Sequence, residues 1–521
     1  MSRCAGVVAG VVLAVVPACG GSVDRFVSAN APIVALSHVR VIDGSGGPGK
    51  DDQTLIIRDG RIQTVGDAAG VAVPPSSRIF DLRGRTVFPG LIGMHEHLFY
   101  QYQPAGSDGR AAQAQDAFAK LYLACGVATI RTGGTLDLAA DARIKRAIDE
   151  GREPGPKIHL TGRYLGGSTA IPDPDAIARE VGAQADEGAT SFKAYVTLRG
   201  AELRAAVKAA HARGFRITGH LCAVGFREAA SAGIDNVEHG LPFDTELYSD
   251  KQPDVCPNQY NVFDELAGME ISDTRIRETI GALVRHGVAV TSTLATIEMF
   301  IGREFPLDPR TLGVLAPGLQ QQIRLAYEER ERANNRQTRV WASMLGKEMA
   351  FERAFVSAGG RLMAGVDPTG WGGIVAGFGD QRELELLVDA GFTPEQAIEI
   401  ATANGAAYLF ESKDIGTVEA GKRADLVVVR GNPSTHIADV RNVEWVFKDG
   451  VGYDPAALIA AAQGGVRPYD LWYLFFSPLG VNLVTLVRVL LAAVIGRRVY
   501  QQLRRRAPHP STLPAIASSE S

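Results

Sequence analysis

The middle of the chain alternates short apolar runs with stretches that have the periodicity of an amphipathic helix. Residues 201–213 show the helical pattern, with one apolar face made by Leu203, Ala206, Val207 and Ala210. Eight strand-like apolar runs end near His97, Arg131, Thr161, Lys193, His220, His239, Thr293 and Asp367. Strands that alternate with helices in this way predict an α/β fold, a (β/α)8 barrel of the TIM type over residues 89–413. Residues 320–357 form a charged helical insertion before the last strand.

Material rich in β-strand signals stands at both ends of this region. Two β-rich runs flank Asp59-Gly60, a pair of residues typical of a tight hairpin turn. Similar runs return between residues 424 and 450. We therefore predict a small β-sandwich domain built from both ends of the chain, from residues 32–88 and 414–455.

The N-terminus has the charge, the apolar core and the small-residue cleavage site of an export signal. We assign residues 1–31 to a signal peptide and linker. The run Val16-Pro17-Ala18-Cys19 resembles a bacterial lipoprotein box, in which Cys19 would become a lipidated N-terminus. Plain cleavage after Ala18 explains the same residues equally well.

The C-terminus carries an apolar segment. Residues 471–496 contain a single charge, Arg488, and five arginines follow. This length can cross a bilayer, and the basic flank would place the main body outside the cytoplasm. We predict a hydrophobic, membrane-spanning helix with a basic tail over residues 468–506 and a disordered tail over residues 507–521. The alternative is an amphipathic helix packed on the body or on the membrane surface.

The two ends together predict an exported protein on the periplasmic or extracellular side. It would associate with the membrane through a lipid on Cys19, through the C-terminal helix, or through both.

Composition narrows the remaining partners. Charged residues make up 21% of the chain, the net charge is −4, and no basic stripe is present, so we expect no nucleic-acid partner. The five cysteines are sparse and lack C-x-x-C spacing, which argues against a disulfide framework and against a thiolate zinc site. Any metal ion would therefore be held by histidine and carboxylate.

Six polar residues stand at the ends of predicted barrel strands. His95 and His97 are two residues apart on a strand and so project to the same side, where they could chelate one ion. Each of the other residues alone has a plainer interpretation, as a core histidine, a solvated lysine or a helix cap. We infer a catalytic site because all six are expected at the same end of the barrel. The six residues are His95, His97, Lys193, His220, His239 and Asp367.

Further motifs accompany these six residues. They are Pro89-Gly90-Leu91-Ile92 before the histidine pair, and residues 126–131, 390–397, 401–406 and 416–426. With these motifs the chain resembles the amidohydrolase superfamily over residues 33–455, in particular its imidazolonepropionase-like and prolidase-like secreted members.

The resemblance implies a site with two divalent metal ions, usually zinc. His95 and His97 would hold the first ion, His220 and His239 the second, and Lys193, carboxylated by CO2, would bridge the two. Asp367 would bind the first ion weakly and handle protons during catalysis. Relatives often assemble, which makes a homo-oligomer an expectation as well.

Some positions depart from the pattern. The family commonly has Asp where this chain has Gly93, and Arg-Asp where it has Arg131-Thr132, but neither familiar residue is a metal ligand. The candidates for substrate binding are aromatic residues that follow strand ends: Tyr100, Tyr195 and Trp371. An aromatic residue on a loop is more often a packing residue.

The sequence thus predicts an exported, metal-dependent amidohydrolase that cleaves amide or peptide-like C–N bonds of a small-molecule substrate with a metal-bridged hydroxide. An esterase, lactonase or organophosphate hydrolase could use the same site. The alternative from a different functional class is a non-catalytic, membrane-tethered binding protein. The presence of all candidate metal ligands argues against it.

Overall fold

The computed structural model describes residues 23–102, 110–167, 173–301, 308–332, 336–368 and 373–468. Nearly all of them belong to the first of two units, Met1–Arg467 and Pro468–Ser521. The predicted export signal, the lipid site at Cys19 and the apolar segment at residues 471–496 lie outside the described residues and stay predictions. No helix within the described ranges is both long and apolar enough to cross a membrane.

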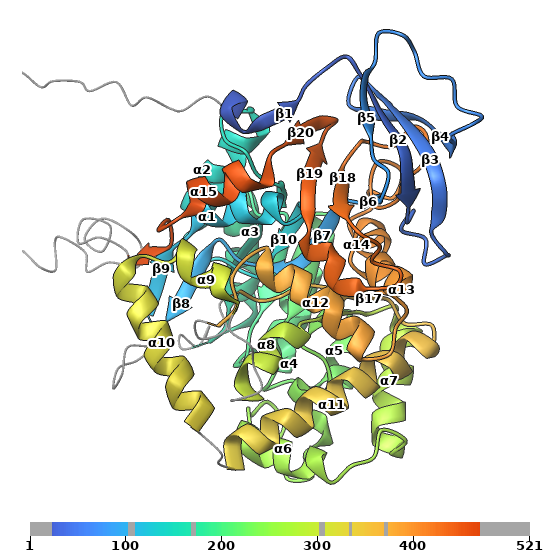
Figure 1. The fold of residues 1–521 in the computed structure, drawn as a ribbon. Helices are drawn as coiled ribbons and strands as arrows, with labels where there is room; N and C mark the ends of the chain where they lie inside the picture. Colours follow the sequence, from blue (N-terminus) through green and yellow to red (C-terminus); the bar gives the residue numbers. More distant parts are fainter. Residues whose placement is uncertain are drawn as a thin grey trace, which may run out of the picture. The chain divides into compact units, whose positions relative to one another are not determined.

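The first and last parts of the described chain share one sheet. Its strands are β1 (Val27–Ala29), β2 (Ile33–Val41), β3 (Lys50–Arg58), β4 (Arg61–Asp67), β5 (Arg78–Asp81), β6 (Arg85–Pro89), β18 (Leu426–Arg430), β19 (Val443–Lys448) and β20 (Val451–Tyr453). Their order is β1-β20-β19-β18-β6-β2-β3-β4, with β5 paired to β2. In Figure 1 the blue strand β6 therefore runs beside the orange strand β18. Whether residues 32–88 and 414–455 form a domain separate from the barrel stays a prediction.

The hairpin predicted around Asp59-Gly60 is confirmed. Strands β3 and β4 pair antiparallel up to Arg58 and Arg61. Asp59 and Gly60 both have left-handed backbones, with φ of 50° and 78°. Two such residues in succession make the turn whose twist matches that of the strands.

Parallel strands form the α/β part of the described chain. They are β7 (Leu91–Glu96), β10 (Val127–Thr132), β11 (Lys157–His159), β12 (Thr161–Leu165), β13 (Ser191–Ala194), β14 (Arg216–Gly219), β15 (Asn236–Glu238), β16 (Ala289–Ser292) and β17 (Leu362–Ala364). They pair in the orders β7-β10-β11 and β12 through β17. A parallel bridge between Thr135 and Arg163 joins the two groups. The amides of Val366 and Asp367 donate to the carbonyl of His95 at 3.2 and 2.9 Å, which returns the order to β7. The arrangement is consistent with a TIM-barrel-type domain.

The third barrel strand ends later than predicted. Thr161 begins β12 instead of ending a strand, because the chain changes partner at Leu160. Strand β11 pairs with β10, whereas the carbonyl of Leu160 accepts hydrogen bonds from Thr190 and Ser191 next to β13. The extended run therefore continues to Leu165.

Helices follow most of these strands. They are α1 (Gln115–Ala124), α2 (Leu138–Asp149), α3 (Pro174–Asp186), α4 (Gly200–Ala212), α5 (Phe226–Ala232), α6 (Gln259–Ala267), α7 (Thr274–His286), α8 (Leu294–Glu298), α9 (Pro309–Val314), α10 (Pro317–Arg332), α11 (Arg336–Ser357), α12 (Phe378–Asp389), α13 (Pro394–Ile400), α14 (Ala403–Tyr408) and α15 (Pro455–Ala462). The predicted apolar face of α4 is buried, and Leu203 joins the main hydrophobic cluster with Ile130 and Phe192. Helices α10 and α11 form the predicted insertion before the last strand, β17.

Short elements complete the described part of the chain. They are β8 (Phe99–Tyr102), β9 (Arg110–Gln113), β21 (Arg467–Pro468) and the 3-10 helices η1 (Val23–Phe26), η2 (Leu241–Phe243), η3 (Thr245–Leu247), η4 (Met299–Ile301) and η5 (Ile437–Arg441). Strands β8 and β9 pair antiparallel after the first barrel strand.

One disulfide corrects the expectation drawn from the cysteine count. Cys222 and Cys256 are bonded, with Cα atoms 4.8 Å apart, although 34 residues separate them in sequence. Cys222 lies two residues beyond His220, and Cys256 lies in the segment between η3 and α6. No local sequence motif predicts this disulfide, because the loops after β14 and β15 bring the two thiols together only in the folded chain.

Candidate active site

Strand β7 delivers two histidines to one side of the barrel. His95 is the fifth residue of β7, and His97 follows its last residue. Two glycines that directly follow the strands β10 and β17, Gly133 and Gly365, leave room for His95. A Cβ atom at Gly133 would clash with the His95 ring, and one at Gly365 would clash with the His95 backbone. These positions therefore admit no larger residue without moving His95.

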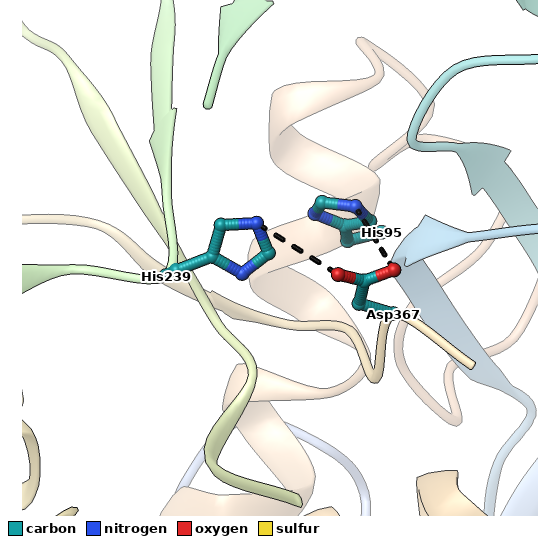
Figure 2. Close-up of side chains that lie close together, drawn as sticks. All are labelled: His95, His239 and Asp367. Carbon is teal, nitrogen blue, oxygen red and sulfur yellow. Dashed lines mark ion pairs between the residues drawn. The ribbon is translucent and has the colours of Figure 1, made fainter. Parts of the chain in front are cut away.

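Three imidazoles converge on Asp367. The Nε2 atoms of His97 and His95 lie 3.2 and 3.8 Å from its Oδ1 atom. Nε2 of His239 lies 3.9 Å from the other oxygen, Oδ2. Figure 2 shows the carboxylate facing the rings of both His95 and His239. The ligand atoms of His95, His239 and Asp367 all lie within 4.8 Å of one another, so this group could hold a metal ion.

The second nitrogen of each ring faces a hydrogen-bond acceptor. Nδ1 lies 3.0 Å from the Gly134 carbonyl in His97, 2.7 Å from Thr293 Oγ1 in His239, and 2.5 Å from Glu238 Oε2 in His95. A proton on Nδ1 leaves the lone pair on Nε2 for a metal ion. All three rings thus present Nε2 to the same carboxylate.

Burial decides the charge of these groups. It lowers the pKa of His95 to about 4 and the pKa of His239 to about 3, so both rings are neutral near pH 7. Burial alone would raise the pKa of Asp367, but the neighbouring His95 and His97 hold that pKa well below its usual value. The lone pair of a neutral imidazole and a carboxylate oxygen are both hydrogen-bond acceptors, so they repel each other when they face one another. A cation bound between them would remove this repulsion.

Two residues of this group have left-handed backbones. His239 has φ of 66° and Asp367 has φ of 44°. Non-glycine residues adopt this conformation at an energetic cost, in turns and also at active sites. The fold therefore holds both side chains in place against a local preference.

Lys193 contacts a carboxylate for which the sequence suggested no role. Its Nζ atom forms an ion pair with Oε2 of Glu238. The other oxygen, Oε1, accepts hydrogen bonds from Arg131 at 3.0 Å and from Thr218 at 2.5 Å. All four residues are buried.

Glu238 and Arg131 are thus site residues that sequence reasoning missed. A signal was present on strand β15, where Asn236 and Glu238 are polar and two residues apart, so they share one face. Both accept a hydrogen bond from Arg131. Both side chains are fully buried, so this polar face is the signal that could have found them.

The structure brings the six predicted residues into one group of contacts. The ring centroid of His220, which follows β14, lies 4.6 Å from that of His239. Lys193 reaches His95 through Glu238. Their individual assignment as metal ligands stays a prediction.

The predicted substrate-binding residues fare differently. Tyr195 lies beside the site, with its ring centroid 5.2 Å from that of His220. Tyr100 is fully buried in the main hydrophobic cluster, 6.0 Å from Phe118 between centroids, so packing explains it in this structure. Trp371 lies outside the described residues.

Comparisons with known proteins agree with this geometry. Residues 86–451 match the amidohydrolase family. Imidazolonepropionase of Deinococcus radiodurans is 25% identical over 432 residues, which cover 74% of this chain and 88% of the relative.

Solved structures share the fold. A Xaa-Pro dipeptidase with bound methionine has a TM-score of 0.61 at 21% identity, with 81% of this chain and all of that chain covered. Bottromycin amidohydrolase has a TM-score of 0.62 at 20% identity, with 83% and 91% covered. The family match spans well over half of the chain and includes all of the candidate site residues. The chain therefore belongs to the amidohydrolase family and is a hydrolase that acts on carbon–nitrogen bonds.

Proposed function

We propose that the protein is an exported, metal-dependent hydrolase of amide or peptide-like bonds in small molecules. The observation that carries the proposal is the convergence of three Nε2 atoms on one carboxylate. His95, His97 and His239 each face Asp367 with this nitrogen, and each has Nδ1 next to an acceptor. No other group of histidine, cysteine and carboxylate atoms in the described chain has the mutual spacing of the group that includes His95, His239 and Asp367.

The residues fit a divalent metal ion. Nε2 of His239 is buried and has no hydrogen-bond partner in the described part of the chain, although Nδ1 of the same ring is bonded to Thr293. An unpaired buried nitrogen costs free energy unless a ligand binds it. Imidazole and carboxylate together suit zinc.

The ions would be held by the residues that the sequence predicts. His95, His97 and Asp367 would hold one ion, His220 and His239 another, and Lys193 would bridge them once carboxylated. The 3.9 Å between Nε2 of His239 and Oδ2 of Asp367 supports two adjacent sets of ligands. Bound divalent cations supply activated water near neutral pH and polarise the acyl oxygen of the substrate.

Asp367 is the residue that handles protons in this proposal. Its side chain is 17% exposed, whereas those of His95, His97 and His239 are at most 3% exposed, so it is the group among them that a substrate can reach. Its carboxylate is ionised, which is the form that accepts a proton, and bound divalent cations would lower the pKa of the attacking water. It can then return that proton to the leaving nitrogen.

The names of the relatives suggest substrates for a first screen. One relative is an imidazolonepropionase and one neighbour is a Xaa-Pro dipeptidase, so cyclic amides and dipeptides are the substrate classes that we propose. Export is supported by the Cys222–Cys256 disulfide, because such bonds persist in oxidising compartments outside the cytoplasm.

The test combines metal analysis with a substrate panel. We expect the purified chain to bind about two zinc ions and to hydrolyse members of a panel of dipeptides, N-acyl amino acids and cyclic amides. Replacing both His95 and His239 by Asn should abolish zinc binding and activity. The matched control is His211→Asn, at a half-exposed histidine of helix α4 that pairs with Asp235. A chain that binds no metal, or one that cleaves only lactones and aryl esters, would contradict the proposal.

A further inference from the structure

Glu238 occupies the centre of the buried polar network beneath the proposed metal site. Its side chain has no exposed surface. Oε2 contacts Nδ1 of His95 at 2.5 Å and forms an ion pair with Lys193. Oε1 accepts from Arg131 and from Thr218. Three donors, from Lys193, Arg131 and Thr218, and the nearby Nδ1 atom of His95 therefore surround one carboxylate, which is about the number that its lone pairs can accept.

The two oxygens of Glu238 serve different neighbours. Oε2 contacts His95 and Lys193, both predicted metal ligands, whereas Oε1 contacts Arg131 and Thr218, neither of which is a predicted ligand. Arg131 is fixed further by the carbonyl of Met94 and by Asn236. The Oε1 side thus anchors the carboxylate, and the Oε2 side is aimed at the ligands.

We propose that Glu238 is a positioning residue that sets two metal ligands at once. Its Oε2 atom keeps the proton of His95 on Nδ1, so Nε2 faces Asp367, and the same atom lies beside Nζ of Lys193, which keeps an N–H donor after carboxylation. The inference rests on the proposed function, because it matters only if His95 binds a metal ion. Carboxylate partners of ligating histidines act in this way in other metal sites, where their loss typically weakens metal binding about 10- to 100-fold.

A structural role alone is the competing explanation. Glu238 would then only neutralise the buried charge of Arg131, and its loss would change stability without changing metal affinity. The two explanations differ in which oxygen matters. Thr218→Val removes a donor from the Oε1 side and leaves the Oε2 contacts intact, so it is the matched control.

The experiment measures zinc affinity of the full-length chain by competition with a chelator, for wild type, Glu238→Gln, Glu238→Asp and Thr218→Val. We expect Glu238→Gln to weaken zinc binding about 10- to 100-fold and Thr218→Val to leave it within about twofold. Glu238→Asp keeps the charge but shortens the side chain, so it should also weaken binding. This second variant keeps the test open if Glu238→Gln fails to fold.

Cobalt substitution gives a readout that stability alone does not move. The visible absorption bands of the Co2+-loaded protein report ligand geometry, and we expect them to shift in the two Glu238 variants and not in Thr218→Val. Folded Glu238 variants that bind zinc as tightly as wild type would overturn the inference while leaving the proposed function intact. A wild-type chain that binds no zinc would overturn both.

Discussion

Two groups of mostly buried carboxylates are present in this protein, and their pKa values shift in opposite directions. The first group is Asp367 and Glu238. The second group is Glu348 and Glu352 on α11 with Glu383 on α12. Burial by itself would raise the pKa of every one of these side chains. The outcome differs because only the first group has basic partners within the described chain.

The balance of partners sets the sign of the shift. His95, Lys193 and Arg131 outweigh burial at Glu238, so its pKa lies well below the usual value. No ion pair in the described residues reaches Glu348, Glu352 or Glu383, and their pKa values are raised, to about 8 for Glu348 and about 7 for Glu383. In this protein, the carboxylates of the candidate site are the ones that their neighbours keep ionised.

The largest expected effect follows from breaking the first group. Asp367→Asn removes the proton acceptor but keeps the size of the side chain, and Asn tolerates the left-handed backbone at this position. We expect turnover of whichever amide the panel identifies to fall about 10²- to 10⁴-fold, with the fold unchanged. Steady-state kinetics and circular dichroism measure the two quantities.

The control for this variant is Glu348→Gln, which changes a carboxylate of the second group. Turnover at pH 7 should stay close to that of wild type in this control. An Asp367→Asn enzyme with wild-type turnover would remove Asp367 from the reaction and leave it only a structural neighbour of His97.

The contrast between the two groups also shows what the sequence could predict. The sequence predicted that four histidines lie at strand ends: His95, His97, His220 and His239. This was possible because the two-residue period of a strand and the alternation of strands with helices are local patterns. Glu238 stood next to His239 in that same pattern, but its role depends on Lys193 and Arg131, which come from other strands. The polar face of β15 is a local sign that Glu238 has polar neighbours, but no local pattern predicts which residues these are.

The fold shows the same division. The hairpin at Asp59-Gly60 follows from two residues, and the structure reproduces it. The bond between Cys222 and Cys256 depends on how two loops approach each other, and the cysteine count argued against it. Likewise, the charged pattern of the insertion predicted a helix but not that Glu348 and Glu352 would be buried. Local sequence patterns therefore do not predict which distant segments contact one another.

A second prediction concerns stability and pH in the second group. Glu348→Gln replaces an acid that the folded protein keeps protonated, and its amide can still accept from the backbone amide of Leu241, as Oε2 does at 2.6 Å. Between pH 4.5 and about 8 the folded state binds the proton and the unfolded state does not, so wild-type stability falls as pH rises across this range.

The Glu348→Gln variant should not lose stability in this way as the pH rises, because it has no ionisable group at this position. We expect Glu348→Gln and wild type to have similar free energies of unfolding near pH 4.5, and the variant to be more stable by on the order of 3 kcal/mol at pH 8.5. Urea unfolding at the two pH values measures this difference. An equal gap at both pH values would mean that Glu348 is ionised in the folded protein.

The smallest predicted effect uses two adjacent residues at the end of β16, each of which serves a different group. Thr293 contacts Nδ1 of His239 at 2.7 Å, whereas the hydroxyl of Ser292 donates to Glu383 at 2.6 Å.

Thr293→Val keeps the shape of the side chain but removes the partner of His239, so zinc affinity should fall about tenfold. Ser292→Ala should leave zinc affinity within about twofold and cost about 1 kcal/mol of stability, because a hydrogen bond to Glu383 is lost. Chelator competition and urea unfolding on both variants separate the two effects. If Ser292→Ala weakened zinc binding as much as Thr293→Val, the two groups of carboxylates would act as one network, and the contrast between them would not hold.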